Sequence, residues 1–170
     1  LAQKDKDVYL GRELSIHHHG FTHTMGKRYV DSLLLKSKMT DAKPVATPGV
    51  KDGKDSDDTS LSADEHKDYR SIVGSLQWLA FDRWDLLFAT KELARRLAAP
   101  TNDDKKKLKH FLRYLKSTKD LEMKVLPTKT PFHTAKDDRR GSFTKKHVTL
   151  HVAVDSDWTG CKTTRKSTSG

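Results

Sequence analysis

Two aspartates in the C-terminal part of the chain have the type and spacing that metal-ion chemistry needs. Apolar residues alternate with other residues from 148 to 154, which predicts a strand with one apolar face. Asp155 and Asp157 follow it, and side chains two positions apart on a strand point to the same side. Carboxylate oxygens suit Mg²⁺, and pairs of such ions assist phosphodiester hydrolysis. Two carboxylates do not complete such a site, and by pattern alone both are more typical of a strand end or a turn.

A set of cations indicates a second kind of chemistry, contact with a polyanion. The chain has 33 Lys and Arg against 23 Asp and Glu, and its net charge of +10 favours nucleic acid or another polyanion as partner. Five cations share the outer side of one expected helix: Lys105, Lys106, Lys109, Arg113 and Lys116. They could follow a phosphate backbone, or they could be the solvated side of an amphipathic helix.

Residues 69–119 are expected to form the helical body that positions these cations. Apolar residues recur there at three- and four-residue steps in three successive runs, with a break that starts at Asp82 and a stop at Pro100. Thr101 or Asn102 can cap the third run, which carries the cations. The inner side of that third helix is apolar: Leu108, Phe111, Leu112 and Leu115.

The N-terminal part is expected to be a β-hairpin. Residues 8–25 have the composition of two strands joined around residues 17–20. The first strand contains Tyr9, Leu10 and Gly11, and a glycine there lets another backbone approach closely.

Four histidines also lie in this hairpin, at positions 17, 18, 19 and 23. Consecutive strand residues point to opposite faces, and no cysteine or carboxylate spacing completes a metal site. An exposed polar turn is therefore favoured over a metal site.

The rest of the chain is expected to be a short helix and connecting segments. Apolar spacing predicts the helix at residues 29–39. Residues 49–67 are rich in Asp, Ser, Lys and Gly, which predicts a flexible linker, since the glycine and glutamate of a calcium-binding EF-hand loop are missing. Residues 121–147 predict a polar tether that opens with a short strand at 121–126.

Composition limits the cellular setting. The single cysteine, Cys161, excludes an internal disulfide and fits an intracellular, reducing location. No run approaches the roughly 18 apolar residues of a membrane span, so we expect no membrane partner. The hydrophobic fraction of 34% indicates that part of the chain is loop or disordered.

Four motifs in a fixed order resemble the Pol polyproteins of copia-type LTR retrotransposons over essentially the whole chain. They read YLGREL, KPVATP, YRSIVGSL with HFLRYLK, and DSDWTGCKTTRKSTSG. The resemblance implies an α+β fold in four parts. These are a primer-grip-like hairpin ending the polymerase palm at residues 1–25, a helical thumb and connection at 26–120, a tether at 121–147 and the first RNase H hairpin at 148–170. One departure is Arg83-Trp84-Asp85, where the family commonly has Arg-Pro-Asp, so we expect Asp82 or Asp85 to cap the following helix.

The resemblance also implies a function. The parent protein copies RNA into DNA and degrades the RNA of the hybrid with the help of Mg²⁺. Asp155 matches its first metal-binding RNase H aspartate, with Asp157 as a neighbour, whereas the other acidic residues of both active centres belong to flanking sequence. We therefore expect a Pol fragment that binds template–primer through residues 9–11 and the cations of the third helix, next to the rest of the polyprotein. It should neither catalyse nor bind Mg²⁺ tightly alone. The alternatives are a domesticated nucleic-acid-binding remnant and a decayed product with no role.

Overall fold

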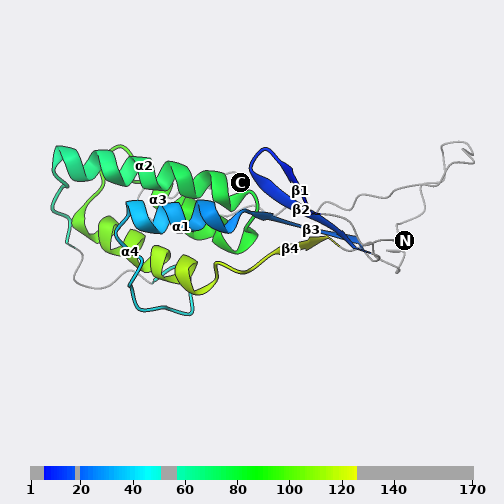
Figure 1. The fold of residues 1–170 in the computed structure, drawn as a ribbon. Coiled ribbons are helices and arrows are strands. Elements are labelled where there is room, and N and C mark those ends of the chain that lie inside the picture. Colours follow the sequence, from blue (N-terminus) through cyan, green and yellow to red (C-terminus); the bar gives the residue numbers. More distant parts are fainter. Residues whose placement is uncertain (1–5, 18–19, 51–56, 126–170) are drawn as a thin grey trace, which may run out of the picture. The chain divides into compact units, whose positions relative to one another are not determined.

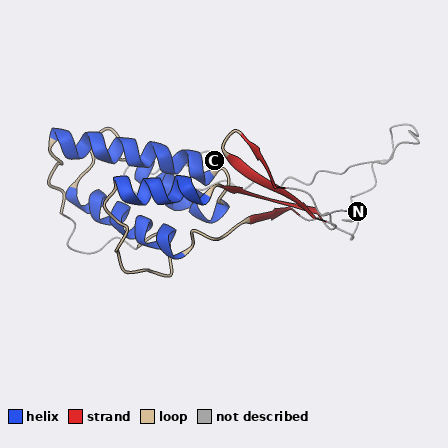
Figure 2. Ribbon diagram, viewed as in Figure 1, coloured by secondary structure: helices blue, strands red, loops and turns tan. Residues whose placement is uncertain are grey.

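The computed structural model of this chain describes residues 6–17, 20–50 and 57–125. The chain divides into two compact units, Leu1–Lys129 and Thr130–Gly170, and all of the described residues belong to the first. That first unit is mixed α+β, with one antiparallel sheet and a group of packed helices (Figures 1 and 2). The predicted fold class is thus confirmed, whereas the predicted strand at 148–154 lies outside the described residues.

The sheet has the strand order β1-β2-β3-β4. Its strands are β1 (Lys6–Tyr9), β2 (Arg12–His17), β3 (Gly20–Met25) and β4 (Met123–Val125). Strands β2 and β3 form the predicted hairpin, with His17 opposite Gly20. Strand β4 confirms the short strand expected at 121–126 and pairs with β3.

A second hairpin interrupts the single strand that we expected at residues 8–16. Tyr9 pairs with Arg12, so only Leu10 and Gly11 form the loop between β1 and β2. Their φ angles are 50° and 78°, as in the two-residue turns whose twist matches that of paired strands. The prediction was wrong because such turns usually carry Asn or Asp before the glycine, and leucine gives no such indication.

Four α-helices and a short 3₁₀ helix make up the helical part of the described chain. They are α1 (Lys27–Lys36), α2 (Ala63–Ala80), η1 (Trp84–Leu86), α3 (Leu87–Ala94) and α4 (Asn102–Ser117). The helices expected from apolar spacing are all present. Their inner sides form one core that includes Leu33, Val73, Leu76, Leu86, Phe111 and Leu115. None of these helices is long and apolar enough to cross a membrane.

Helix α2 begins inside the segment 49–67 that we expected to be a linker. The backbone N–H of Glu65 donates to the Ser62 hydroxyl, and the Glu65 carboxylate accepts from the Ser62 N–H at 3.2 Å. This reciprocal capping box satisfies donors at the start of the helix and overrides the polar composition. Helix α4 begins in the same way, with Thr101, one of the two predicted caps, as the capping residue and Asp104 as its partner.

Neither Asp82 nor Asp85 caps the helix that follows them. The residues before η1 and α3 are Arg83 and Leu86, and neither makes a side-chain capping bond. The expectation was wrong because both carboxylates accept hydrogen bonds from arginines instead. Charged donors give a partly buried carboxylate stronger bonds than backbone N–H groups do.

Candidate nucleic-acid interface

The five predicted cations of α4 do not form a uniformly solvated row. Lys106 and Lys109 are exposed, whereas Lys105, Arg113 and Lys116 are half-buried. Four of the five have a partner within the described residues. The outer side of α4 therefore combines structural contacts with cations that are available to a ligand.

Lys105 ties α4 to the start of α2 by an ion pair with Glu65. This hydrogen bond and the backbone N–H of Ser62 lower the pKa of Glu65 from its usual 4.5 to about 2. Lys106 lies 3.7 Å from a carboxylate oxygen of Asp57, and both side chains are accessible to water. Water screens such exposed pairs, so a phosphate group can replace the carboxylate at little cost.

Arg113 and Lys116 hold the segment after α1 against α4. Arg113 Nε donates to the carbonyl of Lys43 at 2.7 Å, and Lys116 Nζ donates to that of Ala42 at 3.0 Å. Figure 1 shows this segment, in cyan, beside α4. Carbonyl oxygens carry no net charge, so these hydrogen bonds fix the positions of both cations without neutralising their positive charge.

Two shallow depressions lie on the outer side of α4. The larger has a volume of about 300 Å³, and its lining includes Lys106, Lys107, Lys109, His110 and Arg113. The smaller, about 170 Å³, is lined by Asp57, Asn102, Lys105, Lys106 and Lys109. Lys106 and Lys109 thus line both, and Lys109 has no ion-pair partner among the described residues. These two cations are the most available ones in the set.

Lys107 and His110 belong to this surface although the sequence did not single them out. Lys107 pairs with Asp103 one turn earlier, and a ring nitrogen of His110 lies 2.9 Å from the carbonyl of Thr47. Residues three or four positions apart on a helix share a face, so the spacing of positions 103, 106, 107 and 110 could have revealed both side chains.

The tip of the β1–β2 hairpin is apolar and exposed. The side chains of Tyr9 and Leu10 are 65% and 66% exposed. Gly11 Cα is in open space, since a Cβ built there meets no atom within 4 Å. The three residues predicted to contact nucleic acid therefore lie together at one accessible turn.

A part-buried ion pair positions this tip against the helices. Arg12 Nε lies 2.7 Å and 2.9 Å from the two carboxylate oxygens of Asp82, which is only 2% exposed. A ring nitrogen of His23 lies 3.1 Å from the same carboxylate, and the Arg12 guanidinium lies 4.5 Å from the ring centre of Trp78. The sheet is thereby fixed to the end of α2.

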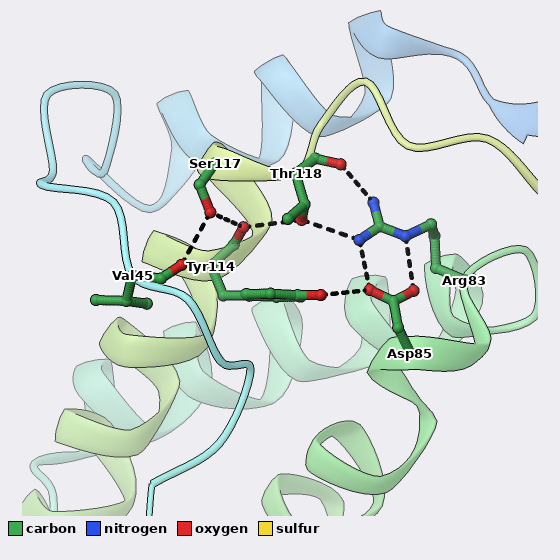
Figure 3. A network of polar contacts seen from close by, with 6 residues as sticks. All are labelled: Val45, Arg83, Asp85, Tyr114, Ser117 and Thr118. Atoms are coloured by element: carbon green, nitrogen blue, oxygen red, sulfur yellow. Dashed lines mark hydrogen bonds and ion pairs between the residues drawn. The ribbon is translucent and has the colours of Figure 1, made fainter.

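A second polar network joins η1 to the end of α4 (Figure 3). Arg83 donates to both carboxylate oxygens of Asp85, at 2.8 Å and 2.7 Å, and to the carbonyl and hydroxyl of Thr118. The Tyr114 hydroxyl also donates to Asp85 at 3.0 Å. Burial acts to raise the pKa of Asp85, but the hydrogen bonds and charge of Arg83 outweigh it, so the pKa is lowered.

The structure does not bring the predicted residues into one site. The hairpin tip and the α4 cations lie on separate elements, and no hydrogen bond or ion pair of the described residues links them. Asp155 and Asp157 lie outside the described residues. His17 and His23 bind Thr22 and Asp82, and no cluster of metal-binding side chains is present in the described segments.

Three known proteins are similar to this chain, whereas no protein-family model and no solved structure matches it. Over 98% of its length it is 36% identical to the retrovirus-related Pol polyprotein from transposon RE2 of Arabidopsis thaliana, and over 87% it is 37% identical to that from transposon RE1. Over 95% it is 34% identical to the uncharacterized mitochondrial protein AtMg00810 of the same plant. The chain spans 10%, 9% and 60% of these proteins.

The similarity to the RE2 protein extends over almost the whole chain and so includes all four motifs, from YLGREL to DSDWTGCKTTRKSTSG. The class of protein that this similarity indicates is the retrotransposon Pol polyproteins. The chain belongs to the copia-type Pol polyproteins, of which it represents about a tenth of the length.

Proposed function

We propose that this chain is part of the reverse transcriptase and RNase H region of Pol, works inside the cell and holds template–primer without catalysing a reaction alone. The observation that carries this proposal is the conformation of Leu10, a non-glycine residue with a φ of 50° at an exposed turn. A left-handed backbone costs about 1–2 kcal/mol for such a residue. Asn or Gly would fit the turn better and would expose less apolar surface.

Leucine is costly at this position because its backbone is left-handed and its apolar side chain is exposed to water. Such a costly residue is expected at a position that contacts a partner. Tyr9 beside it adds an aromatic ring, which can stack on a base or a sugar. Gly11 leaves space for a nucleic-acid backbone. These features support the hairpin tip as the element that touches the primer or template.

The outer side of α4 supports the same proposal through its charge. Lys106 and Lys109 line both depressions, and Arg113 keeps its charge beside them. Such cations bind phosphates without regard to sequence, as a protein that tracks template–primer requires.

Asp155 and Asp157 remain the proposed start of the RNase H centre. When bound, Mg²⁺ would supply the activation of water for phosphodiester hydrolysis. Two carboxylates do not complete such a site, and both aspartates lie outside the described residues, so the proposal assigns no catalytic step to this chain.

The test is the affinity of the full chain for a fluorescein-labelled RNA–DNA hybrid, measured by anisotropy at low salt. Leu10→Asn should retain the fold and weaken binding by about fivefold, since loss of one apolar contact of about 1 kcal/mol has that effect. Leu35→Asn is the matched control, because Leu35 is similarly exposed on α1. The proposal is overturned if wild type does not bind, or if both variants bind as wild type does.

A second candidate is a nucleic-acid-binding protein that acts without a polymerase. The similarity to AtMg00810 favours it, because the matched segment makes up 60% of that protein rather than a tenth. The upstream and downstream reading frames distinguish the two. A Tyr-x-Asp-Asp motif upstream and further acidic residues downstream support the polymerase segment, whereas stop codons on both sides support the second candidate.

A further inference from the structure

Five large apolar side chains are exposed where α2, η1 and α3 meet, and we call them the apolar patch: Trp78, Phe81, Trp84, Leu87 and Phe88. Each is between 44% and 69% exposed. We propose that another part of the Pol polyprotein packs on this patch. This inference rests on membership of the Pol family and not on nucleic-acid binding.

The backbone beneath the patch is fixed, so the exposed rings cannot turn inward. Leu79, Ala80 and Leu86 fill the inner positions of the same segments and are buried. Arg83 anchors η1 to the end of α4, and Asp82 anchors the end of α2 to the sheet. The patch is therefore a preformed surface, and a partner need not order it on binding.

Leaving these side chains in water is unfavourable. Burying one large apolar side chain is worth roughly 1.5–3 kcal/mol, and grouped exposed apolar residues mark interaction surfaces. Tryptophan and phenylalanine with an adjacent arginine are also typical of the central, best-packed part of protein interfaces. Here Trp78 lies edge-on to Phe81 at 6.5 Å and under the Arg12 guanidinium.

Charge favours a protein partner over nucleic acid on this patch. Both arginines at the junction are paired, Arg12 with Asp82 and Arg83 with Asp85. Lys91, one turn further along α3, is also engaged. A phosphate backbone would find no unpaired arginine here, whereas an apolar, uncharged protein surface would complement the patch.

The polyprotein itself is the partner that the relatives indicate. About nine tenths of the RE2 and RE1 Pol polyproteins lie outside the segment that this chain matches. A segment of a longer polypeptide is expected to meet its neighbours through apolar surface, as domains of one chain do.

The test is hydroxyl-radical footprinting read by mass spectrometry at single residues. The full chain is compared alone and in a chimera in which it replaces the matched segment of RE2 Pol. We expect Phe81, Trp84 and Phe88 to be oxidised several-fold more slowly in the chimera. Leu35, which is exposed on α1 and outside the patch, is the internal reference. Equal oxidation of the patch in both proteins overturns the proposal.

Two other outcomes would also overturn it. Protection that rises with the concentration of the isolated chain would identify a second copy as the occupant, and protection that requires an oligonucleotide would identify nucleic acid. Should the chimera not fold, RE2 Pol lacking the matched segment is added to the chain instead, with the same expected protection.

A paired substitution supplies a second measurement. Phe81→Ser with Phe88→Ser should leave the urea midpoint and hybrid affinity of the isolated chain unchanged and should abolish the difference in footprint at Trp84. Leu35→Ser should leave the urea midpoint, the hybrid affinity and the difference in footprint at Trp84 as they are in wild type. If the hybrid does not bind but the patch is protected, only the template–primer proposal fails.

Discussion

The guanidinium of Arg12 and the carboxylate of Asp82 face each other across 70 positions of sequence, with Nε 2.7 Å from one oxygen and 2.9 Å from the other. Arg12 follows the turn of the exposed hairpin, and Asp82 follows the last turn of α2. This pair is thus the link through which the helices set the position of the hairpin tip.

Removing one side of this pair should be costly. Asp82→Ala leaves the Arg12 guanidinium beside Trp78 without its counter-ion; breaking a fully buried ion pair costs about 3–5 kcal/mol, and this part-buried pair should lose less than that but more than an exposed pair. The free energy of unfolding from urea titration measures the loss. Glu92→Ala, which removes an exposed pair with Arg95, is the control and should cost less than about 1 kcal/mol. Equal losses in the two variants would contradict the assigned role.

Replacing Trp84 by proline should stabilise the fold. Trp84 is the first residue of η1, a position that suits proline, and the preceding Arg83, with a φ of −134° and a ψ of 82°, lies outside the helical region that a following proline disfavours. A proline compatible with the backbone typically adds about 0.4–1 kcal/mol by restricting the unfolded chain. The urea midpoint of Trp84→Pro should rise, while that of Trp84→Ala should stay close to wild type. A fall in the proline variant would show that the backbone at η1 rejects it.

The two available cations of α4 should determine how salt affects hybrid binding. Each phosphate contact contributes about 0.7–0.9 to the slope of log K against log salt, so Lys106→Gln with Lys109→Gln should reduce the slope by about 1.5. Anisotropy titrations at several salt concentrations measure it. Lys67→Gln, an exposed lysine on α2, controls for net charge. An unchanged slope in the double variant would exclude this surface.

Acid should weaken the junction of α2 and α4. Because the folded pKa of Glu65 is lowered to about 2, its contribution to stability is complete above pH 4.5 and is lost as the pH falls towards 2. Glu65→Gln keeps a capping-box side chain but removes the charge. Its Tm should therefore fall less than that of wild type between pH 5 and pH 2, whereas Glu92→Gln should follow wild type. Parallel curves for all three proteins would contradict the shift.

The helical part could be predicted from the sequence because its pattern is local. Three- and four-residue spacing marked the inner sides of α2 and α4, and Thr101 was recognisable as a cap. The start of α2 was also encoded locally, by Ser62 and Glu65, but the acidic composition around them obscured it.

What the sequence could not reveal are the partners of charged side chains. Asp82 and Asp85 looked like helix caps, but Asp82 pairs with Arg12, which is 70 positions away in the sequence, and Asp85 pairs with the fork of donors on the guanidinium of Arg83, two positions before it. The α4 cations were predicted correctly as an outer face, yet the contacts of Arg113 and Lys116 with residues 42–43 follow from tertiary structure. Residue type predicted the charge, and the fold decided which charges remain available.

Strand β4 has one more consequence. It pairs with β3, with Phe21 opposite Val125 and His23 opposite Met123, so the helices leave the sheet at one strand and return at its neighbour. Neighbouring strands lie about 4.8 Å apart. The helical segment between them is therefore closed at its base by two paired strands, so the sheet fixes the distance between the two ends of that segment.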